Sequence, residues 1–254
     1  MADTLTYNGG RYYIVKEKNA TYYLPSVTTV IGEYEDKSWI QDWYDRVGEE
    51  NAKAIAKFSA NRGTVMHMYC EFYFTDYHIS QKQRLVNTLK TTYEWAVNEG
   101  FTEDEITVGR NLFYNFYNDG IFKRVDSIVM LEQRLYSLIA NGYAGRVDKI
   151  YRNSKQQVVI ADYKSSKKPK DESYIEGYKK QIAAYYVAYW EMFKIKPSHG
   201  EIWISNEQYD EPQLYIVTYN DIKIYYKKFL DAVKHYHKKY GTLTHETVEK
   251  LKLI

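Results

Sequence analysis

The segment VVIADYKSSKKP, residues 158–169, constrains the fold of this chain more than any other. Its first three residues are branched and apolar, which predicts a strand buried within a sheet. Charged side chains follow at Asp162 and Lys164, at the end of the same strand. Because side chains alternate along a strand, these two point to the same face. A buried strand that ends in an acid and an amine on one face indicates a functional site at that end.

The segments around this strand predict the rest of a sheet. Asn153 and Ser154 separate two of the apolar runs, which predicts a hairpin. A helix is expected over about residues 174–193, where Ile182 and Tyr186 belong to one apolar stripe. The predicted strands cover residues 129–138, 143–151, 157–164, 200–205 and 213–219. This order predicts an α/β fold with a mixed central sheet flanked by helices.

The remaining segments are mostly helical, and we expect one domain over residues 1–254. Residues 4–23 alternate in polarity and contain Asn8-Gly9-Gly10, a hairpin signal, and Ser26 is the expected N-cap of a short helical turn. Helices are expected over residues 37–75 with a break near 61–63, over 81–99 and 104–119, and in the tail at 220–252. These segments predict an N-terminal hairpin and helical elaboration (1–125), an α/β core (126–219) and C-terminal helices (220–254).

Composition excludes several classes of site. The chain has 254 residues, 44% of them hydrophobic, which suffices for one sizeable core. The single cysteine, Cys70, cannot form an internal disulfide, a four-cysteine zinc site or a four-cysteine iron–sulfur cluster, and it suits a reducing compartment. The N-terminus resembles neither a signal peptide nor a transit peptide, and no apolar run reaches the ~18 residues of a membrane span. We therefore expect a cytoplasmic protein without membrane association.

Asp148 lies on the strand before Asp162 and is the second candidate acid. A three- or five-residue loop pairs residue 148 with residue 160 and turns Asp148 to the face of Asp162, whereas an even loop turns it away. Two carboxylates about 5 Å apart repel by roughly 3 kcal/mol at an effective dielectric of ~20. Mg²⁺ accepts hard oxygen ligands and removes this repulsion, and Lys164 beside it suits hydrolysis of a phosphodiester. The alternative is a surface ion pair on an ordinary hairpin.

Two helical pairs of residues extend the candidate site. His67 and Glu71 are four residues apart in RGTVMHMYCE, and Gln181 and Tyr185 are four residues apart in KKQIAAYY. Each pair therefore shares one face of its helix. A local His–Glu hydrogen bond explains the first pair equally well, and a half-buried helix face explains the second.

These elements occur in a fixed order: R-G-T-x-x-H-x-x-x-E, a strand glutamate at Glu132, G-R-V-D, D-Y-K and Q-x-x-x-Y. The set resembles the PD-(D/E)XK nuclease superfamily, and specifically its RecB-like branch. Together with LPSVTTVIG near the N-terminus, it is similar to the mitochondrial genome maintenance exonuclease group and its phage relatives. The resemblance covers about residues 24–190 and implies a restriction-endonuclease-like core. Cys70 alone cannot supply the cysteine-ligated cluster that several RecB-like nucleases carry.

The resemblance implies roles for individual residues and a Mg²⁺ or Mn²⁺ cofactor. The implied catalytic residues are Asp148, Asp162, Lys164, Glu71 and Glu132, and the implied metal ligands are His67, Asp148 and Asp162. Gln181 and Tyr185 would contact the DNA backbone or brace the active site. Residues 144–180 carry ten basic and five acidic side chains, which favours DNA along this part of the chain. Further expected DNA contacts are Arg62, Arg146, Ser165, Ser166, Lys167 and Lys168.

The function expected from these features is metal-dependent DNA exonuclease activity, acting from single-stranded ends. DNA repair or recombination in a bacterial or phage-infected cell is the expected setting, with replication or recombination proteins as partners. Residues 80–120 would form a wall or arch that admits only a free strand. The alternatives are a structure-specific endonuclease of repair and recombination, and a non-catalytic DNA-binding recombination module.

Overall fold

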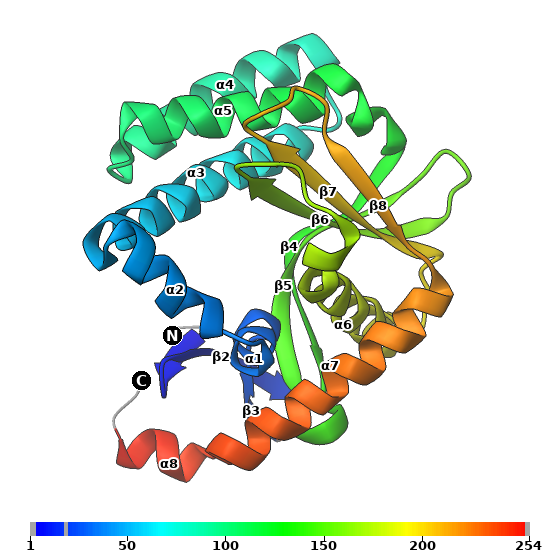
Figure 1. Cartoon of the computed structure of the whole chain (residues 1–254). Helices are drawn as coiled ribbons and strands as arrows, with labels where there is room; N and C mark the ends of the chain where they lie inside the picture. The colour runs from blue at the N-terminus through cyan, green and yellow to red at the C-terminus, as the bar shows by residue number, and fades with distance from the viewer. Residues whose placement is uncertain (1–3, 18–19, 252–254) are drawn as a thin grey trace.

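The computed structural model describes residues 4–17 and 20–251 (Figure 1). A five-stranded sheet forms its centre, in the order β4-β5-β6-β7-β8. All neighbouring pairs are antiparallel except β6 and β7, which are parallel and are connected through α6. The strands are β4 (Ser127–Ser137), β5 (Tyr143–Arg152), β6 (Val158–Ser166), β7 (His199–Asn206) and β8 (Gln213–Val217). The predicted α/β fold with a mixed, helix-flanked sheet is thus confirmed.

Each face of this sheet packs against its own set of helices. Ile150, Ile160 and Ile202 lie in the core with α6 (Glu176–Phe193) and α7 (Tyr219–Tyr240). On the other face, Tyr151 and Trp203 pack with α3 (Glu49–Thr75) and α5 (Glu103–Asp119), and α4 (Gln81–Asn98) runs alongside them. Within residues 4–17 and 20–251, no helix is both long enough and apolar enough to span a membrane.

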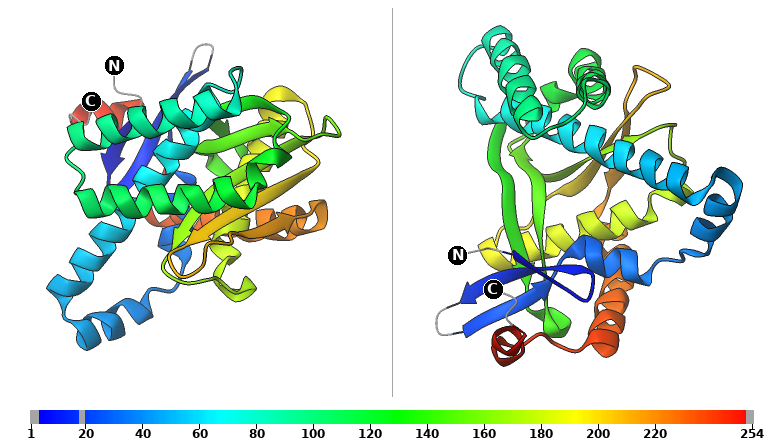
Figure 2. Two further views of the ribbon diagram at one scale, coloured as in Figure 1. Left: turned by 90° about the horizontal axis from the view of Figure 1, so that it is seen from above. Right: turned by 90° about the vertical axis from the view of Figure 1, so that its left-hand side faces the viewer.

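The N-terminal segment forms a separate small sheet of β1 (Thr4–Tyr7), β2 (Gly10–Glu17) and β3 (Ala20–Pro25). The predicted turn is confirmed, since Asn8 and Gly9 both have positive φ, as a tight hairpin turn requires. Ser26 then caps α1 (Val27–Tyr34), because its Oγ accepts a hydrogen bond from the Thr29 amide at 3.0 Å. Figure 2 shows β4 and β5 extending from the central sheet to this N-terminal sheet, which joins the two into one body.

The expected break near residues 61–63 is wrong. The helix breaks instead at Gly48, where φ is 82°, between α2 (Ser38–Val47) and α3. α3 continues through Gly63, where an added Cβ would lie 2.9 Å from the Ser165 Oγ. The glycine therefore permits a close approach of α3 to β6 and does not end a helix. The other expected helices are confirmed, and the tail contains α7 and the short α8 (His245–Lys250).

The β5–β6 hairpin has the odd loop that the candidate site needs. Arg152 pairs with Val158, so residues 153–157 form a five-residue loop, in which the Asn153 Oδ1 accepts hydrogen bonds from the amides of Lys155 and Gln157. The expected pairing of residue 148 with 160 is wrong, because Ile150 pairs with Ile160. In this register Asp148 comes opposite Asp162. The shift is two residues, so Asp148 keeps its predicted face.

Candidate active site

A polar cavity of about 420 Å³ lies between α3, the N-terminal sheet and strands β4, β5 and β6. Most of the residues predicted from the sequence line it: His67, Glu71, Glu132, Arg146, Asp148, Lys164, Ser165, Gln181 and Tyr185. Asp162 is almost fully buried directly beneath it. Residues far apart in the sequence are thus brought together at one place in the fold.

Three potential metal ligands converge in this cavity. His67, Glu132 and Asp148 each offer one ligand atom, and these atoms lie within 4.8 Å of one another. The His67 Nδ1 is 3.5 Å from the Asp148 Oδ2. One imidazole nitrogen and two carboxylate oxygens form a donor set that fits Mg²⁺ or Mn²⁺. The sequence predicts Asp162 as the third metal ligand, whereas in the structure the Glu132 carboxylate lies beside His67 and Asp148.

The carboxylate of Asp162 has partners of its own. Its Oδ2 forms an ion pair with the Lys164 ammonium, and its Oδ1 accepts a hydrogen bond from the Gln181 Nε2 at 2.8 Å. Asp148 is held differently, since its Oδ2 accepts a hydrogen bond from the Tyr163 amide at 2.7 Å. Burial and the neighbouring Asp148 carboxylate raise the pKa of Asp162 to about 6. The two acids therefore lie together, as predicted, at a real electrostatic cost.

Glu132 is held in an unfavourable conformation and environment. Its φ of 49° lies in the left-handed region although it belongs to a strand, which costs about 1 kcal/mol for a residue with a Cβ. Burial, followed by the nearby Asp148 carboxylate, raises the pKa of Glu132 to about 9. On its exposed side the Arg146 Nε lies 2.8 Å from the Glu132 Oε2. Strain of this kind is typical of functional sites, and a bound cation would relieve its electrostatic part.

The imidazole of His67 is prepared to act as a neutral ligand. Burial, with a further contribution from the Lys164 ammonium, lowers the pKa of His67 to about 4. The ring is therefore uncharged near neutral pH and offers a lone pair to a metal. Glu71, one turn further along α3, lines the same cavity, and burial raises its pKa. The catalytic role that the resemblance implies for Glu71 stays a prediction.

Gln181 and Tyr185 lie beneath the acids and brace them. The Gln181 amide contacts both Asp162 and, at 3.4 Å, the Tyr185 hydroxyl. Tyr185 is only 3% exposed, and its ring packs on Gly145, where an added Cβ would lie 2.6 Å from the ring. This explains the glycine of G-R-V-D. Of the two roles considered from the sequence, the geometry favours bracing over contact with DNA.

Two of the expected DNA contacts are used inside the protein. Arg62 is 3% exposed, and its guanidinium forms an ion pair with Glu207 and lies 3.5 Å from the Ser166 carbonyl oxygen. Ser166 is also buried, and its Oγ donates to the Lys168 carbonyl oxygen at 2.7 Å. These contacts argue against direct DNA binding by either residue. Lys167 and Lys168, in contrast, are exposed beside the cavity.

Several residues around the site were not predicted. Arg11, Tyr13 and Thr28 line the cavity from the N-terminal sheet and α1. The available signal was the adjacent LPSVTTVIG segment, which contains Thr28. Lys149, next to Asp148, is fully buried on the opposite face of β5, with its Nζ 3.5 Å from the centre of the Trp203 ring. Burial lowers the pKa of Lys149 well below its usual range, and no local pattern indicates such an environment.

A family model described as the PD-(D/E)XK nuclease superfamily matches residues 38–252. The chain belongs to this superfamily. Among solved structures, this nuclease is similar to one described as a "Putative exonuclease" from Eubacterium rectale, at 15% identity and a TM-score of 0.46. The match covers 70% of this nuclease and 65%, less than two thirds, of that protein. A second structure, SSO0001, is 15% identical with a TM-score of 0.33 over 61% of this chain and 76% of that one. No curated protein matches.

Membership of the superfamily agrees with the cavity. PD-(D/E)XK nucleases hydrolyse nucleic acid with divalent metals, and this nuclease places a histidine and two carboxylates within the distance that one cation spans. The chain therefore belongs to a superfamily of nucleases, and its cavity offers a donor set that a divalent cation can use.

Proposed function

We propose that this nuclease is a Mg²⁺- or Mn²⁺-dependent DNA exonuclease that acts from single-stranded ends. The observation that supports this most is the convergence of His67, Glu132 and Asp148 beside the Asp162–Lys164 ion pair. The order of its motifs, from R-G-T-x-x-H to Q-x-x-x-Y, favours the RecB-like branch and the mitochondrial genome maintenance group with its phage relatives. A bacterial or phage-infected cytoplasm, and partners in replication or recombination, belong to the same proposal.

In this proposal His67, Glu132 and Asp148 hold the cation. The bound metal would lower the pKa of a water and polarise the scissile phosphate. Although burial opposes it, the Asp162 and Asp148 carboxylates raise the pKa of Lys164, so its amine is charged at neutral pH. A charged Lys164 cannot accept a proton. It is suited to orient a water by donating a hydrogen bond and to stabilise the negative charge that develops on the phosphoryl group.

The loop after β6 supplies a surface for the phosphate backbone. Lys167 and Lys168 are exposed on it, two and three residues after Ser165, which lines the cavity. The loop is held by Gln213, whose side chain accepts from the Lys170 amide at 2.7 Å and donates to the Lys170 carbonyl at 2.9 Å. A rigid basic loop loses little entropy on binding. We also propose that residues 1–254 act as one nuclease domain, because the N-terminal sheet and α1 complete the cavity.

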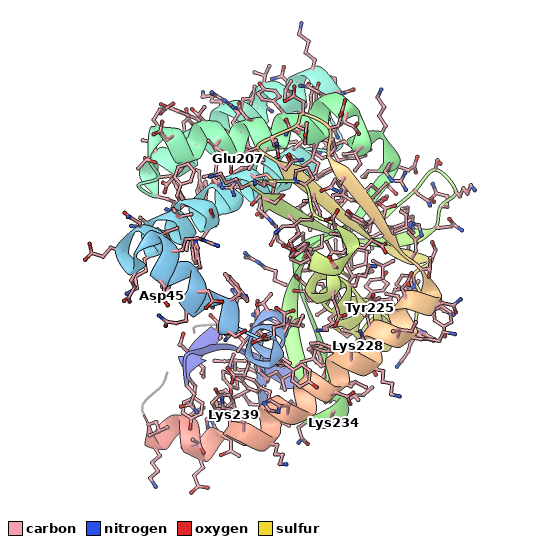
Figure 3. All side chains as sticks on the ribbon, viewed as in Figure 1. Asp45, Glu207, Tyr225, Lys228, Lys234 and Lys239 are labelled. Atoms are coloured by element: carbon pink, nitrogen blue, oxygen red, sulfur yellow. The ribbon has the colours of Figure 1, made fainter. Side chains whose placement is uncertain are left out.

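Replacing Lys167 and Lys168 by alanine is expected to weaken binding of single-stranded DNA and its dependence on salt. Each phosphate contact contributes about 0.7 to the slope of log K against log salt, so the double variant lowers the slope by about 1.4. Fluorescence anisotropy titrations at a series of salt concentrations measure this slope. Lys234 and Lys238 on α7 provide the matched control, since both are exposed there, and Figure 3 shows Lys234 on the outer side of that helix. An equal change in both double variants would contradict the placement of DNA on the loop.

End-labelled oligonucleotides test the proposed activity itself. We expect Mg²⁺ or Mn²⁺ to support stepwise shortening of linear single strands, EDTA to stop it, and circular single strands to stay intact. Cutting of the circles would favour a structure-specific endonuclease. Binding of DNA without cleavage under any of the metals would favour a non-catalytic recombination module.

A further inference from the structure

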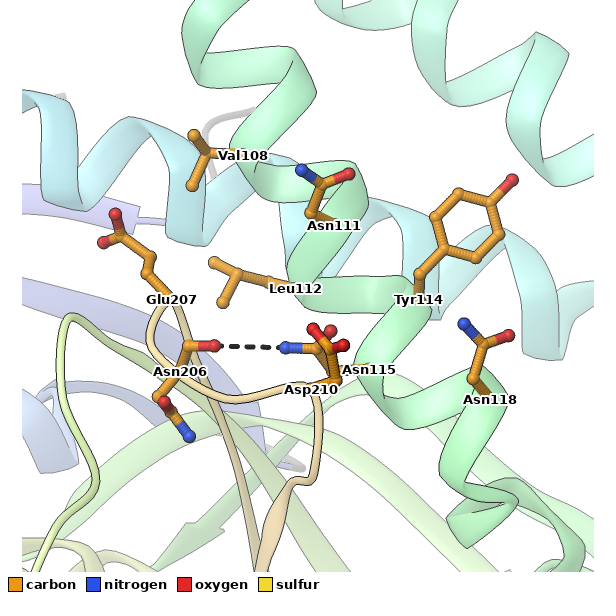
Figure 4. Close-up of a pocket in the computed structure, with 9 residues that line it drawn as sticks. All are labelled: Val108, Asn111, Leu112, Tyr114, Asn115, Asn118, Asn206, Glu207 and Asp210. Atoms are coloured by element: carbon orange, nitrogen blue, oxygen red, sulfur yellow. Dashed lines mark hydrogen bonds between the residues drawn. The ribbon is translucent and has the colours of Figure 1, made fainter.

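We propose that a second polar cavity, next to the active site, binds one base of the substrate strand. The inference rests on the proposed nuclease function and adds a specificity subsite to it. The cavity has a volume of about 520 Å³ and lies between α5 and the loop that joins β7 to β8 (Figure 4). Its polar lining comes from Asn111, Asn115, Asn118, Asn206, Glu207 and Asp210.

Only a thin wall separates this cavity from the active site. Glu207 lines the second cavity, pairs with Arg62 of α3, and donates its backbone amide to the Ser166 carbonyl at 3.2 Å. Gly63, next to Arg62 on α3, and Ser165, next to Ser166 on β6, both line the active-site cavity. A strand that crosses the wall can therefore present consecutive nucleotides to the two cavities.

The second cavity is built by specific contacts. The Asn115 Nδ2 donates to the carbonyl oxygens of Asn206 at 3.1 Å and Tyr209 at 3.2 Å, and Figure 4 shows the first of these bonds. The Asn206 Oδ1 in turn accepts from the amides of Gln208 and Tyr209, at 3.0 and 2.9 Å. These bonds hold the loop against α5. The side-chain amides of Asn111 and Asn118 make no hydrogen bond with the described residues, and both residues are exposed.

The chemistry of the lining selects a base over a phosphate. No lysine or arginine of the described residues lines the cavity, the Glu207 carboxylate is paired with Arg62, and the Asp210 carboxylate repels anions. Side-chain amides donate to and accept from base edges, and a carboxylate accepts from an exocyclic amine. Tyr114 adds an aromatic ring to the lining, as Figure 4 shows, on which a base can stack. A base with an amino group, such as cytosine, therefore fits better than uracil.

Binding of two matched homopolymers tests this inference. Oligo-dC and oligo-dU of equal length differ at carbon 4, where cytosine carries an amine and uracil an oxygen. In fluorescence anisotropy with EDTA, we expect wild type to bind oligo-dC about tenfold more tightly, the scale of a lost polar contact in a polar site. Asn111→Ala and Asp210→Ala are each expected to lower the ratio below about threefold. Glu211→Ala, which removes an exposed acid next to Asp210 that does not line the cavity, leaves the ratio unchanged.

The outcomes separate this inference from the proposed function. Equal binding of the two homopolymers by wild type overturns the subsite, as does a preference that both cavity variants retain. Cleavage of either homopolymer with Mg²⁺ in the absence of any base preference overturns the subsite and leaves the nuclease proposal standing. A preference lost in the variants, without cleavage under any metal, supports the subsite and contradicts the nuclease proposal. Where one cavity variant fails to fold, the other still tests whether a wild-type preference belongs to this cavity, and equal binding by wild type overturns the subsite without either variant.

Discussion

Replacing Lys164 by methionine is expected to lower kcat for DNA cleavage about 10³-fold and to leave KM within a factor of a few. Methionine retains most of the volume of the side chain and removes the charge. The loss corresponds to about 4 kcal/mol of transition-state stabilisation, the upper range for removing one preorganised charged donor. KM changes little because the exposed lysines of the loop after β6, and not Lys164, are the proposed contacts to the ground-state backbone.

The control for this variant is Lys155→Met, an exposed lysine on the β5–β6 loop. Far-UV circular dichroism and thermal melting verify that Lys164→Met folds, because removing the amine takes the ion pair away from the buried Asp162 Oδ2. Residual activity within tenfold of wild type would remove Lys164 from the mechanism. A rise in KM with unchanged kcat would assign it to substrate binding instead.

In the metal-free protein Glu132 is expected to cost about 3 kcal/mol of unfolding free energy between pH 6.5 and 9, measured as the difference between wild type and Glu132→Gln, and Mg²⁺ or Mn²⁺ is expected to restore it. The expected loss is of the size of the repulsion between two carboxylates about 5 Å apart at an effective dielectric of ~20. Burial of the Glu132 side chain, the larger cause of its raised pKa, acts in the same direction. For a chain of this size the expected loss corresponds to roughly 6–12 °C in Tm. A divalent ion at 100 times its Kd would contribute about 2.7 kcal/mol.

The direction in which the unfolding free energy changes with pH follows from the pKa shifts. The pKa of Glu132 is raised from 4.5 to about 9, so the folded protein keeps a proton that the unfolded chain releases, and stability falls as pH rises. Asp162, with its pKa raised to about 6, acts in the same direction at lower pH. The pKa of His67 is lowered to about 4, which acts in the opposite direction below pH 6.5. Lys149, whose pKa burial lowers well below its usual range, acts in the opposite direction in this window, so the contribution of Glu132 is the difference between wild type and Glu132→Gln.

Urea unfolding in chelator, repeated with metal, measures this effect. Glu132→Gln is expected to flatten the dependence on pH and to stabilise the metal-free protein, while weakening stabilisation by the metal. Glu211→Gln serves as the control, since this acid is exposed and far along the chain from the cluster. The same pH dependence in wild type and in Glu132→Gln, without metal, from pH 6.5 to 9 would show that the folded protein does not hold a proton on Glu132.

Local sequence patterns predicted most helices and strands correctly but did not predict the structural role of Gly63. Alternation and helical spacing predicted β5, β6 and α5 to within one or two residues, because these signals depend only on neighbours in the chain. Gly63 was interpreted as a helix break and instead permits contact between α3 and β6. Whether a glycine ends a helix or admits a neighbour depends on what packs against it, which no local pattern contains.

The sequence by itself determined that Asp162 and Lys164 share one face of a strand, because side chains alternate along strands; that Asp148 joins them on this face was decided by the five-residue loop that the structure shows. The sequence also indicated the superfamily. Only the tertiary structure decided that the Glu132 carboxylate joins His67 and Asp148, that Lys164 and Gln181 engage Asp162, and that Arg62 and Tyr185 are buried. These outcomes depend on how α3, β4 and α6 meet around one cavity. Distances between elements far apart in the chain are set by packing and not by local preference.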